Sequence, residues 1–220
     1  AAAGLAAALL LGGCAAGDGG GAPMGCAAAA APCLEGKASV ALTTSKGEVR
    51  LELDGVAAPL TAGNFLDLVR RGAYNGTSFH RVVREPTPFV VQGGDPLSAN
   101  PVTPTSQYGS GSFIDPDTGQ ARLIPLELKL TGEESPRYGE ELTSPTITRQ
   151  LALAHQRGAV AMARSSDVNS ASSQFYVALQ ALPELDGRYA VFGRVSEGMD
   201  VVDRIQQGDR IVKATVVEGG

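Results

Sequence analysis

The sequence predicts a mainly β fold, a closed antiparallel barrel with helices at its ends. Short runs of alternating apolar residues recur from about residue 37 to the end, and turn residues separate them. Only two segments have the spacing of an amphipathic helix. The chain has 220 residues, of which 43% are hydrophobic, so it is long enough to bury a substantial core.

Composition and charge exclude several classes of protein. The net charge of −5 argues against a nucleic-acid partner, which would require a basic face. No run approaches the roughly 20 apolar residues that cross a bilayer. The three Cys and two His do not cluster, so we expect no metal site, and no motif indicates a cofactor. Nothing in the sequence indicates assembly, and we expect a monomer.

The first 37 residues differ in composition from the rest. "GLAAALLLGGC" has the apolar run and small residues of a partial signal peptide, and "LGGC" matches a lipobox with Cys14 as the lipidated residue. The alternative is an ordinary cleaved signal with an incidental Cys14. Residues 15–37 are rich in Ala, Gly and Pro, which predicts a flexible tether. Within it, Cys26 and Cys33 either pair after export or are incidental thiols.

Residues 38–220 form the predicted domain. The expected strands are residues 40–44 and 48–53, which form a hairpin, then the runs near 78–83 and 89–92, and finally 159–163, 174–179, the segment within 185–198 and 210–219. A helix begins with Thr61 as its cap and ends at Gly72, and a short second helix follows Gly198. Residues 97–150 are a long loop-rich insert, with "IPLEL" as a short strand or turn.

Three blocks of sequence resemble the cyclophilin-type peptidyl-prolyl cis–trans isomerases. They are "FHRVV…FVVQGGDP", "GAVAMARS…SASSQFYVAL" and "LDGRYAVFGRV", in the order and at the spacing of that family. The resemblance implies an eight-stranded antiparallel barrel capped by two helices. Together with the signal-like N-terminus and the lipobox, it predicts a bacterial exported enzyme, lipid-anchored outside the cytoplasm, whose partners are proline-containing polypeptide clients. Contact with the membrane is then only through the lipid anchor.

The chemistry of prolyl isomerisation accounts for an arginine and a glutamine in these strands. Amide resonance gives an X–Pro bond a rotational barrier of about 18–20 kcal/mol. A fixed donor aimed at the prolyl nitrogen favours the twisted state, and arginine is suited to that task. The resemblance assigns catalysis to Arg81, Gln92 and Phe89. It assigns substrate binding to a second set, Met162, Ala163, Arg164, Gln174, Tyr176, Leu185 and Tyr189.

The sequence also departs from the family pattern. Arg164, Tyr176, Glu184 and Tyr189 stand where the family commonly has Asn, Phe, Trp and His. Family members with Trp at position 184 bind cyclosporin tightly. Glu184 offers a carboxylate in its place, and we expect that carboxylate to pair with Arg188. The altered rim keeps open a second hypothesis, a weakly catalytic or non-catalytic peptide-binding chaperone.

A hydrolase is a third hypothesis, and the residues around the possible nucleophiles do not favour it. His80 has only His155 as a partner, and it is expected to be structural. Ser172 and Ser173 lack a nucleophile elbow.

Overall fold

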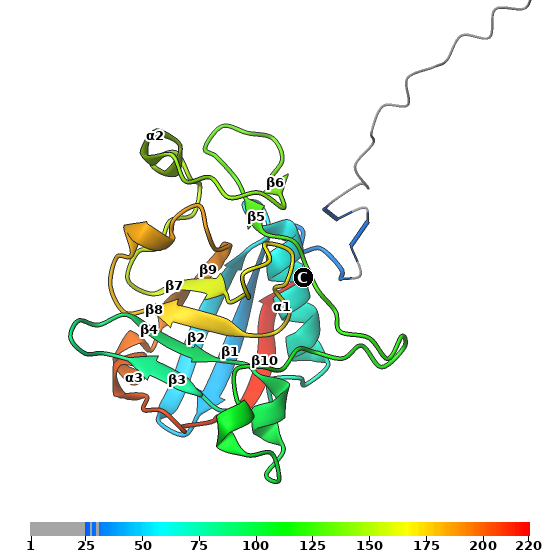
Figure 1. Ribbon diagram of the computed structural model, residues 1–220, viewed down its shortest axis with the longest axis vertical. Helices are drawn as coiled ribbons and strands as arrows, with labels where there is room; N and C mark the ends of the chain where they lie inside the picture. Colours follow the sequence, from blue (N-terminus) through cyan, green and yellow to red (C-terminus); the bar gives the residue numbers. More distant parts are fainter. Residues whose placement is uncertain (1–24, 27, 30) are drawn as a thin grey trace, which may run out of the picture.

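The computed structural model describes residues 25, 26, 28, 29 and 31–220, and Cys14 lies outside them. One sheet of eight strands dominates the fold, in the order β10-β1-β2-β9-β7-β8-β4-β3, and its paired neighbours are antiparallel (Figure 1). The strands are β1 (Lys37–Thr44), β2 (Gly47–Asp54), β3 (Arg81–Val83), β4 (Val90–Gly93), β7 (Ala159–Met162), β8 (Phe175–Ala178), β9 (Val191–Glu197) and β10 (Ile211–Gly219). Within the described residues, no helix is long and apolar enough to span a membrane.

The sheet is curled but not closed, which corrects the prediction of a closed barrel. Strands β3 and β10 form its two ends and do not pair along their length. The ends meet only beside β3, where Ser78 bridges Arg210 and the Ile211 amide donates to the Thr77 carbonyl at 2.8 Å. The contact ends before β3 begins, since Phe79, whose amide donates to the Asp209 carbonyl at 2.7 Å, is the last residue on that side to make it, and β3 pairs along its length with β4 alone.

Helices α1 (Pro59–Arg70) and α3 (Met199–Arg204) are the two that the sequence predicts, and α2 (Pro145–Thr148) is a short addition in the insert. Helix α1 begins two residues before the predicted cap Thr61, with Pro59 in its first turn. No side chain of the helix itself caps it, and the carboxylate of Glu127 does so instead, accepting the Leu60 and Thr61 amides at 3.0 and 2.7 Å. Gly72 ends the helix with φ +71.

The alternation of side chains in β7 and β8 separates two apolar clusters. Val160, Met162, Phe175 and Val177 belong to the large interior cluster, which α1 joins through residues such as Phe65. The other face of these strands contributes to a smaller cluster on the outside of the curl, made of Val90, Ala159, Ala161, Tyr176, Ala178, Leu182 and Val191. The candidate site lies on this outer face.

The end of the predicted tether packs against the domain. Ala31 and Leu34 are buried, and the Leu34 amide donates to the Pro59 carbonyl at 2.9 Å. The segment crosses α1 at Gly63, where an added methyl group would collide with the backbone of residues 32–34. Cys26 and Cys33 form a disulfide, which resolves the alternatives left open by the sequence. The prediction of a flexible tether that extends to residue 37 is therefore wrong for residues 31–37.

Replacing Leu34 with alanine should lower the free energy of unfolding by about 2–5 kcal/mol, the usual cost of such a cavity. The side chain is only 2% exposed and belongs to the interior cluster. Urea denaturation of the full chain measures the loss. Leu123→Ala, at a side chain that is 48% exposed, is the matched control and should change stability little. Equal effects of the two changes would show that the segment does not contribute to the core.

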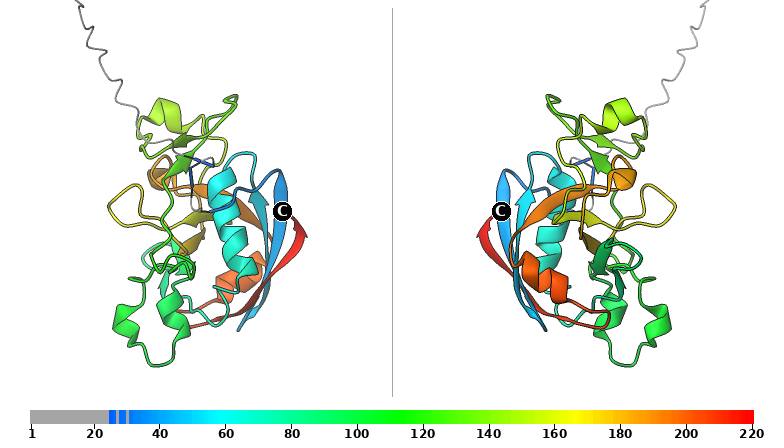
Figure 2. Two further views of the ribbon diagram at one scale, coloured as in Figure 1. Left: turned by 90° about the vertical axis from the view of Figure 1, so that its right-hand side faces the viewer. Right: turned by 90° about the vertical axis from the view of Figure 1, so that its left-hand side faces the viewer.

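The insert runs along one side of the domain (Figure 2). It contains the 3₁₀ helices η1 (Pro96–Ala99) and η2 (Thr105–Gln107), the small sheet of β5 (Glu127–Leu128) and β6 (Arg137–Tyr138), and α2. Buried charges anchor it. Asp95 accepts the amides of Leu97, Gly109 and Gly111, and Arg122, whose side chain is 2% exposed, pairs with Asp67 of α1 and with Asp115. The predicted "IPLEL" strand is β5 and the residues before it.

Candidate functional site

The register of four strands aligns polar and aromatic side chains in one row. Arg81 of β3 lies opposite Gln92 of β4, Gln92 lies opposite Tyr176 of β8, and Tyr176 lies opposite Ala161 of β7. Directly opposed residues point to the same face of a sheet. The row therefore crosses the outer face, beside the smaller apolar cluster.

Three side chains of the site are joined by hydrogen bonds. Arg81 Nη1 donates to Gln92 Oε1 at 3.3 Å, and Gln92 Nε2 donates to Gln174 Oε1 at 3.2 Å. Gln174 Nε2 in turn donates to the Gly111 carbonyl at 2.8 Å. The chain of bonds fixes the direction of the Gln92 amide, which directs its oxygen toward the guanidinium. Arg81 remains exposed to solvent, which leaves its other N–H groups available to a ligand.

An apolar patch lies beside the arginine. It consists of the partly exposed side chains of Phe89, Ala163, Leu185 and Tyr189 together with Tyr176, which is 5% exposed. The Arg81 Cζ lies 5.7 Å from the centroid of the Phe89 ring. Such a patch can bind an apolar ring. The guanidinium beside it can then direct an N–H donor at a polar atom attached to that ring.

A small cavity adjoins the row on the side of the insert. Its volume is about 180 Å³, and Gln92, Ala163 and Gln174 line it together with the insert backbone at residues 109–112. Several serine residues also line it, namely Ser110, Ser112, Ser165, Ser170 and Ser172. The insert is thus part of the site. No local sequence pattern indicates that residues 109–112 of the insert lie beside Gln92 and Gln174.

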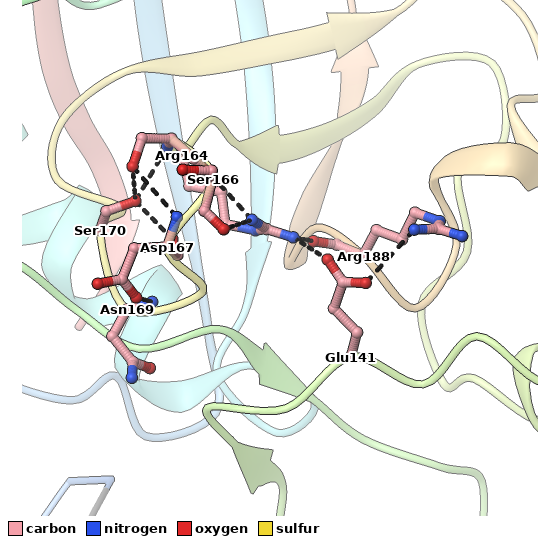
Figure 3. A network of polar contacts seen from close by, with 8 residues as sticks. Glu141, Arg164, Ser166, Asp167, Asn169, Ser170 and Arg188 are labelled. Atoms are coloured by element: carbon pink, nitrogen blue, oxygen red, sulfur yellow. Dashed lines mark hydrogen bonds and ion pairs between the residues drawn. The ribbon is translucent and has the colours of Figure 1, made fainter.

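Arg164 lies at the rim of the cavity but is held by the protein (Figure 3). Its side chain is 6% exposed and forms an ion pair with Glu141 of the insert. It also donates to the Arg188 carbonyl at 2.8 and 3.0 Å, and its Cζ lies 4.9 Å from the Tyr189 ring centroid. Because these contacts occupy the guanidinium, Arg164 shapes the rim and is not free to pair with a ligand.

Two expectations about the rim are wrong. Met162 does not line the site, because it is 1% exposed and packs in the interior cluster, whereas its neighbours Ala161 and Ala163 face outward. Arg188 does not pair with Glu184. Its Nη1 lies 3.3 Å from Glu141 instead, and Glu184 is exposed at the start of the 3₁₀ helix η3 (Pro183–Leu185).

The remaining polar candidates are part of the scaffold. Burial lowers the pKa of His80, whose ring nitrogens are buried without a hydrogen-bond partner in the described structure. The Ser172 hydroxyl accepts the Phe113 amide at 3.0 Å, and the Ser173 carbonyl accepts the Tyr74 hydroxyl at 3.0 Å. No pair of nucleophile and base forms among these residues, as the third hypothesis, a hydrolase, would require.

Comparison with known proteins identifies this arrangement. The family model described as "Cyclophilin type peptidyl-prolyl cis-trans isomerase/CLD" matches residues 39–218, which is most of the chain. The chain belongs to the cyclophilin family. Its fold is the mainly β cyclophilin fold, here with a sheet that stays open between β3 and β10.

Several named isomerases are similar to this cyclophilin chain. A putative thylakoid lumen peptidyl-prolyl cis-trans isomerase of Synechocystis is 40% identical over 86% of the chain, and the chloroplastic isomerase CYP38 of Arabidopsis thaliana is 37% identical over 86%. The chain spans only 49% and 44% of these two relatives. A probable peptidyl-prolyl cis-trans isomerase of Brucella suis is 35% identical, with 81% of this chain and 82% of that protein aligned.

Solved cyclophilin structures share the fold. A cyclophilin from Hirschia baltica superposes with a TM-score of 0.56 at 25% identity, covering 83% of this chain and 75% of the other. A Cryptosporidium parvum cyclophilin, solved in the presence of the dipeptide Ala-Pro, gives a TM-score of 0.56 at 24% identity, covering 82% and 99%. The second likeness supports the fold alone.

Some residues of the cyclophilin site were not found from the sequence. Ala161 and Val90 support the patch from the same face as Tyr176, and strand alternation could have identified them. His155 and Asp186 lie behind Tyr176, and Glu141 holds Arg164. These contacts join segments 20 or more residues apart, so no local pattern indicates them.

Proposed function

We propose that this chain is a peptidyl-prolyl cis–trans isomerase that acts on exported polypeptides. The observation that carries the proposal is the aligned row in which Arg81 is bonded to Gln92 beside the apolar patch. The similar proteins named as isomerases support it. Rotation about an X–Pro bond breaks no covalent bond, so a donor and a ring-binding surface are sufficient.

In the proposed mechanism, the prolyl ring packs on Phe89, Tyr176 and Leu185 of the apolar patch. Arg81 then directs an N–H at the prolyl nitrogen, whose lone pair becomes available only as the amide twists. That interaction is stronger in the transition state than in the ground state, as catalysis requires. Gln92 holds the guanidinium, and its link to Gln174 keeps its amide in one orientation.

The proposal is tested by following cis–trans isomerisation of a short Ala-Pro peptide with the full chain. We expect the relaxation rate to rise in proportion to protein concentration. Binding of the peptide without acceleration would instead favour the alternative, a chaperone that uses the same surface. That alternative draws support from the restrained Arg164 and the exposed Glu184 of the rim.

The rim predicts weak inhibition by cyclosporin. Glu184 is exposed, and an apolar ligand that covered its carboxylate would have to displace water from it. We expect Glu184→Trp to strengthen inhibition roughly tenfold or more, which is about 1.4 kcal/mol. Titrating the inhibitor against both proteins measures the change, with Glu140→Trp as a control at another exposed glutamate. Tight inhibition of the unaltered chain would contradict the assignment of Glu184 to the rim.

We further propose that the protein works outside the cytoplasm as a lipoprotein anchored through Cys14. The Cys26–Cys33 disulfide is typical of an oxidising compartment, and one similar protein is named for the thylakoid lumen. Cys14→Ser should move the protein from the membrane fraction to the soluble fraction of cells that express it. Continued retention on the membrane would contradict a lipid anchor at Cys14.

A further inference from the structure

A chain of buried polar groups lies directly behind the apolar patch. Asp186 Oδ1 accepts the backbone amide of His155 at 2.8 Å and lies 2.8 Å from its Nδ1. The Nε2 of the same ring lies 2.9 Å from the Tyr176 hydroxyl. His155 is 1% exposed and the Asp186 side chain 13%, so water competes little for these bonds. The three residues come from the loop before β7, the turn after η3, and strand β8.

The hydrogen-bond pattern assigns the protons. A carboxylate only accepts, so the His155 proton is on Nδ1, and Nε2 of the neutral ring accepts from the Tyr176 hydroxyl. Burial lowers the pKa of His155, although Asp186 opposes that effect in part. Burial also raises the pKa of Tyr176 well above its usual value. Both groups are therefore neutral near pH 7, and each bond in the chain has one direction.

Tyr176 is the point at which this chain meets the site. It lies opposite Gln92 in the register, and its ring makes an edge contact with Tyr189 at a centroid distance of 5.9 Å. The plane of the His155 ring is nearly parallel to that of Tyr176, at 13°, with the ring centroids 5.9 Å apart. A phenol has one rotatable hydroxyl, and its burial without a hydrogen-bond partner destabilises the fold. The ring therefore keeps the position in which its hydroxyl reaches Nε2.

We propose that His155 and Asp186 are positioning residues of the isomerase site. Asp186 fixes the tautomer of His155, and His155 holds the Tyr176 ring at the height and angle that complete the proline-binding surface. Neither residue touches the substrate. The inference rests on the proposed function, because it assigns Tyr176 to the surface that receives the prolyl ring.

A double-mutant cycle tests the coupling. His155→Leu should lower kcat/KM about tenfold, mainly through KM, because the Tyr176 hydroxyl loses its acceptor and the ring moves. Tyr176→Phe removes the hydroxyl and should cost a smaller factor of about two to three. When Tyr176→Phe is already present, adding His155→Leu should cost almost nothing more. Additive losses, with the same factor in both backgrounds, would overturn the inference.

Asp186→Ala provides a second variant in case His155→Leu unfolds the chain. Without the carboxylate nothing holds the ring proton on Nδ1, so the proton also occupies Nε2 and the Tyr176 hydroxyl loses its fixed acceptor. We expect a loss of kcat/KM of about fivefold in the otherwise unaltered chain and little loss in the Tyr176→Phe background. Equal losses in the two backgrounds would overturn the inference.

Nitrogen NMR of ¹⁵N-histidine-labelled protein gives a readout that does not depend on activity. We expect the neutral His155 ring to carry its proton on Nδ1 in the unaltered chain and to divide it between Nδ1 and Nε2 in Asp186→Ala. A proton on Nε2 of the unaltered chain would overturn the inference while leaving the proposed function intact. Absence of turnover in the unaltered chain would overturn the proposed function, and the inference with it.

Discussion

Arg81→Ala should lower kcat/KM for a prolyl peptide about 100-fold or more, the usual cost of losing one donor to a transition state. The melting temperature should change by no more than a few degrees. The side chain is exposed, and its contacts are a 3.3 Å hydrogen bond to Gln92 and the edge of the patch at Phe89. Isomerisation rates and melting curves of the two proteins measure both quantities.

Two control variants sharpen this test. Arg194→Ala removes an arginine whose side chain is 63% exposed, from β9 and outside the row, and should leave the rate unchanged. Arg81→Lys keeps the charge but loses the planar fork, so it should restore only part of the activity. A rate equal to that of the unaltered chain in Arg81→Ala would contradict the mechanism. Loss of folding would show that Arg81 is a structural residue.

Glu127→Ala should lower the free energy of unfolding by about 3 kcal/mol or more, because each buried donor left without a partner costs about 1–3 kcal/mol. The Glu127 residue is 1% exposed. Its carboxylate accepts the first amides of α1, from Leu60 and Thr61, and the Tyr138 hydroxyl at 2.9 Å. It therefore joins the insert to the helix that covers the interior cluster. Urea denaturation at pH 7 measures the loss.

Glu127→Gln separates the charge of this group from its hydrogen bonds. Burial raises the folded-state pKa of Glu127, and its hydrogen bonds oppose that shift only in part. A raised pKa stabilises the fold below the unfolded-state pKa of about 4.3, and that contribution is lost as pH rises through the folded pKa. The stability of the unaltered chain relative to Glu127→Gln should therefore fall as pH rises from about 4.3 through the folded pKa. A difference that rises with pH would contradict a raised pKa.

Local patterns predict most elements of the fold. The hairpin of β1 and β2, helix α1, and strands β7 to β10 follow from alternation, helical spacing and turn residues within short windows. The errors concern partners that are distant in sequence. The local pattern predicts Thr61 as the cap of α1, but the cap is Glu127, 66 residues further along. Composition assigns Leu34 to a tether because the surface that buries it is not visible in its own segment.

The candidate site is predicted in part. The resemblance identifies Arg81, Gln92 and Tyr176, and the register aligns them in one row. The assignment of Met162 is wrong by one position. Tyr176 pairs with Ala161, and in a strand a shift of one residue moves a side chain to the other face. The sequence could not predict that Glu141 would hold Arg164 and Arg188, because both bonds depend on how the insert folds back.

The most direct test of the central claim is exchange NMR on an Ala-Pro peptide at equilibrium, with the protein present at about one hundredth of the peptide concentration. Uncatalysed exchange takes tens of seconds or longer, so exchange within about a second must be catalysed. The account predicts cross-peaks between the cis and trans signals with the unaltered chain and none with Arg81→Ala. Peptide signals that shift or broaden on binding, without exchange between the two isomers, would contradict it.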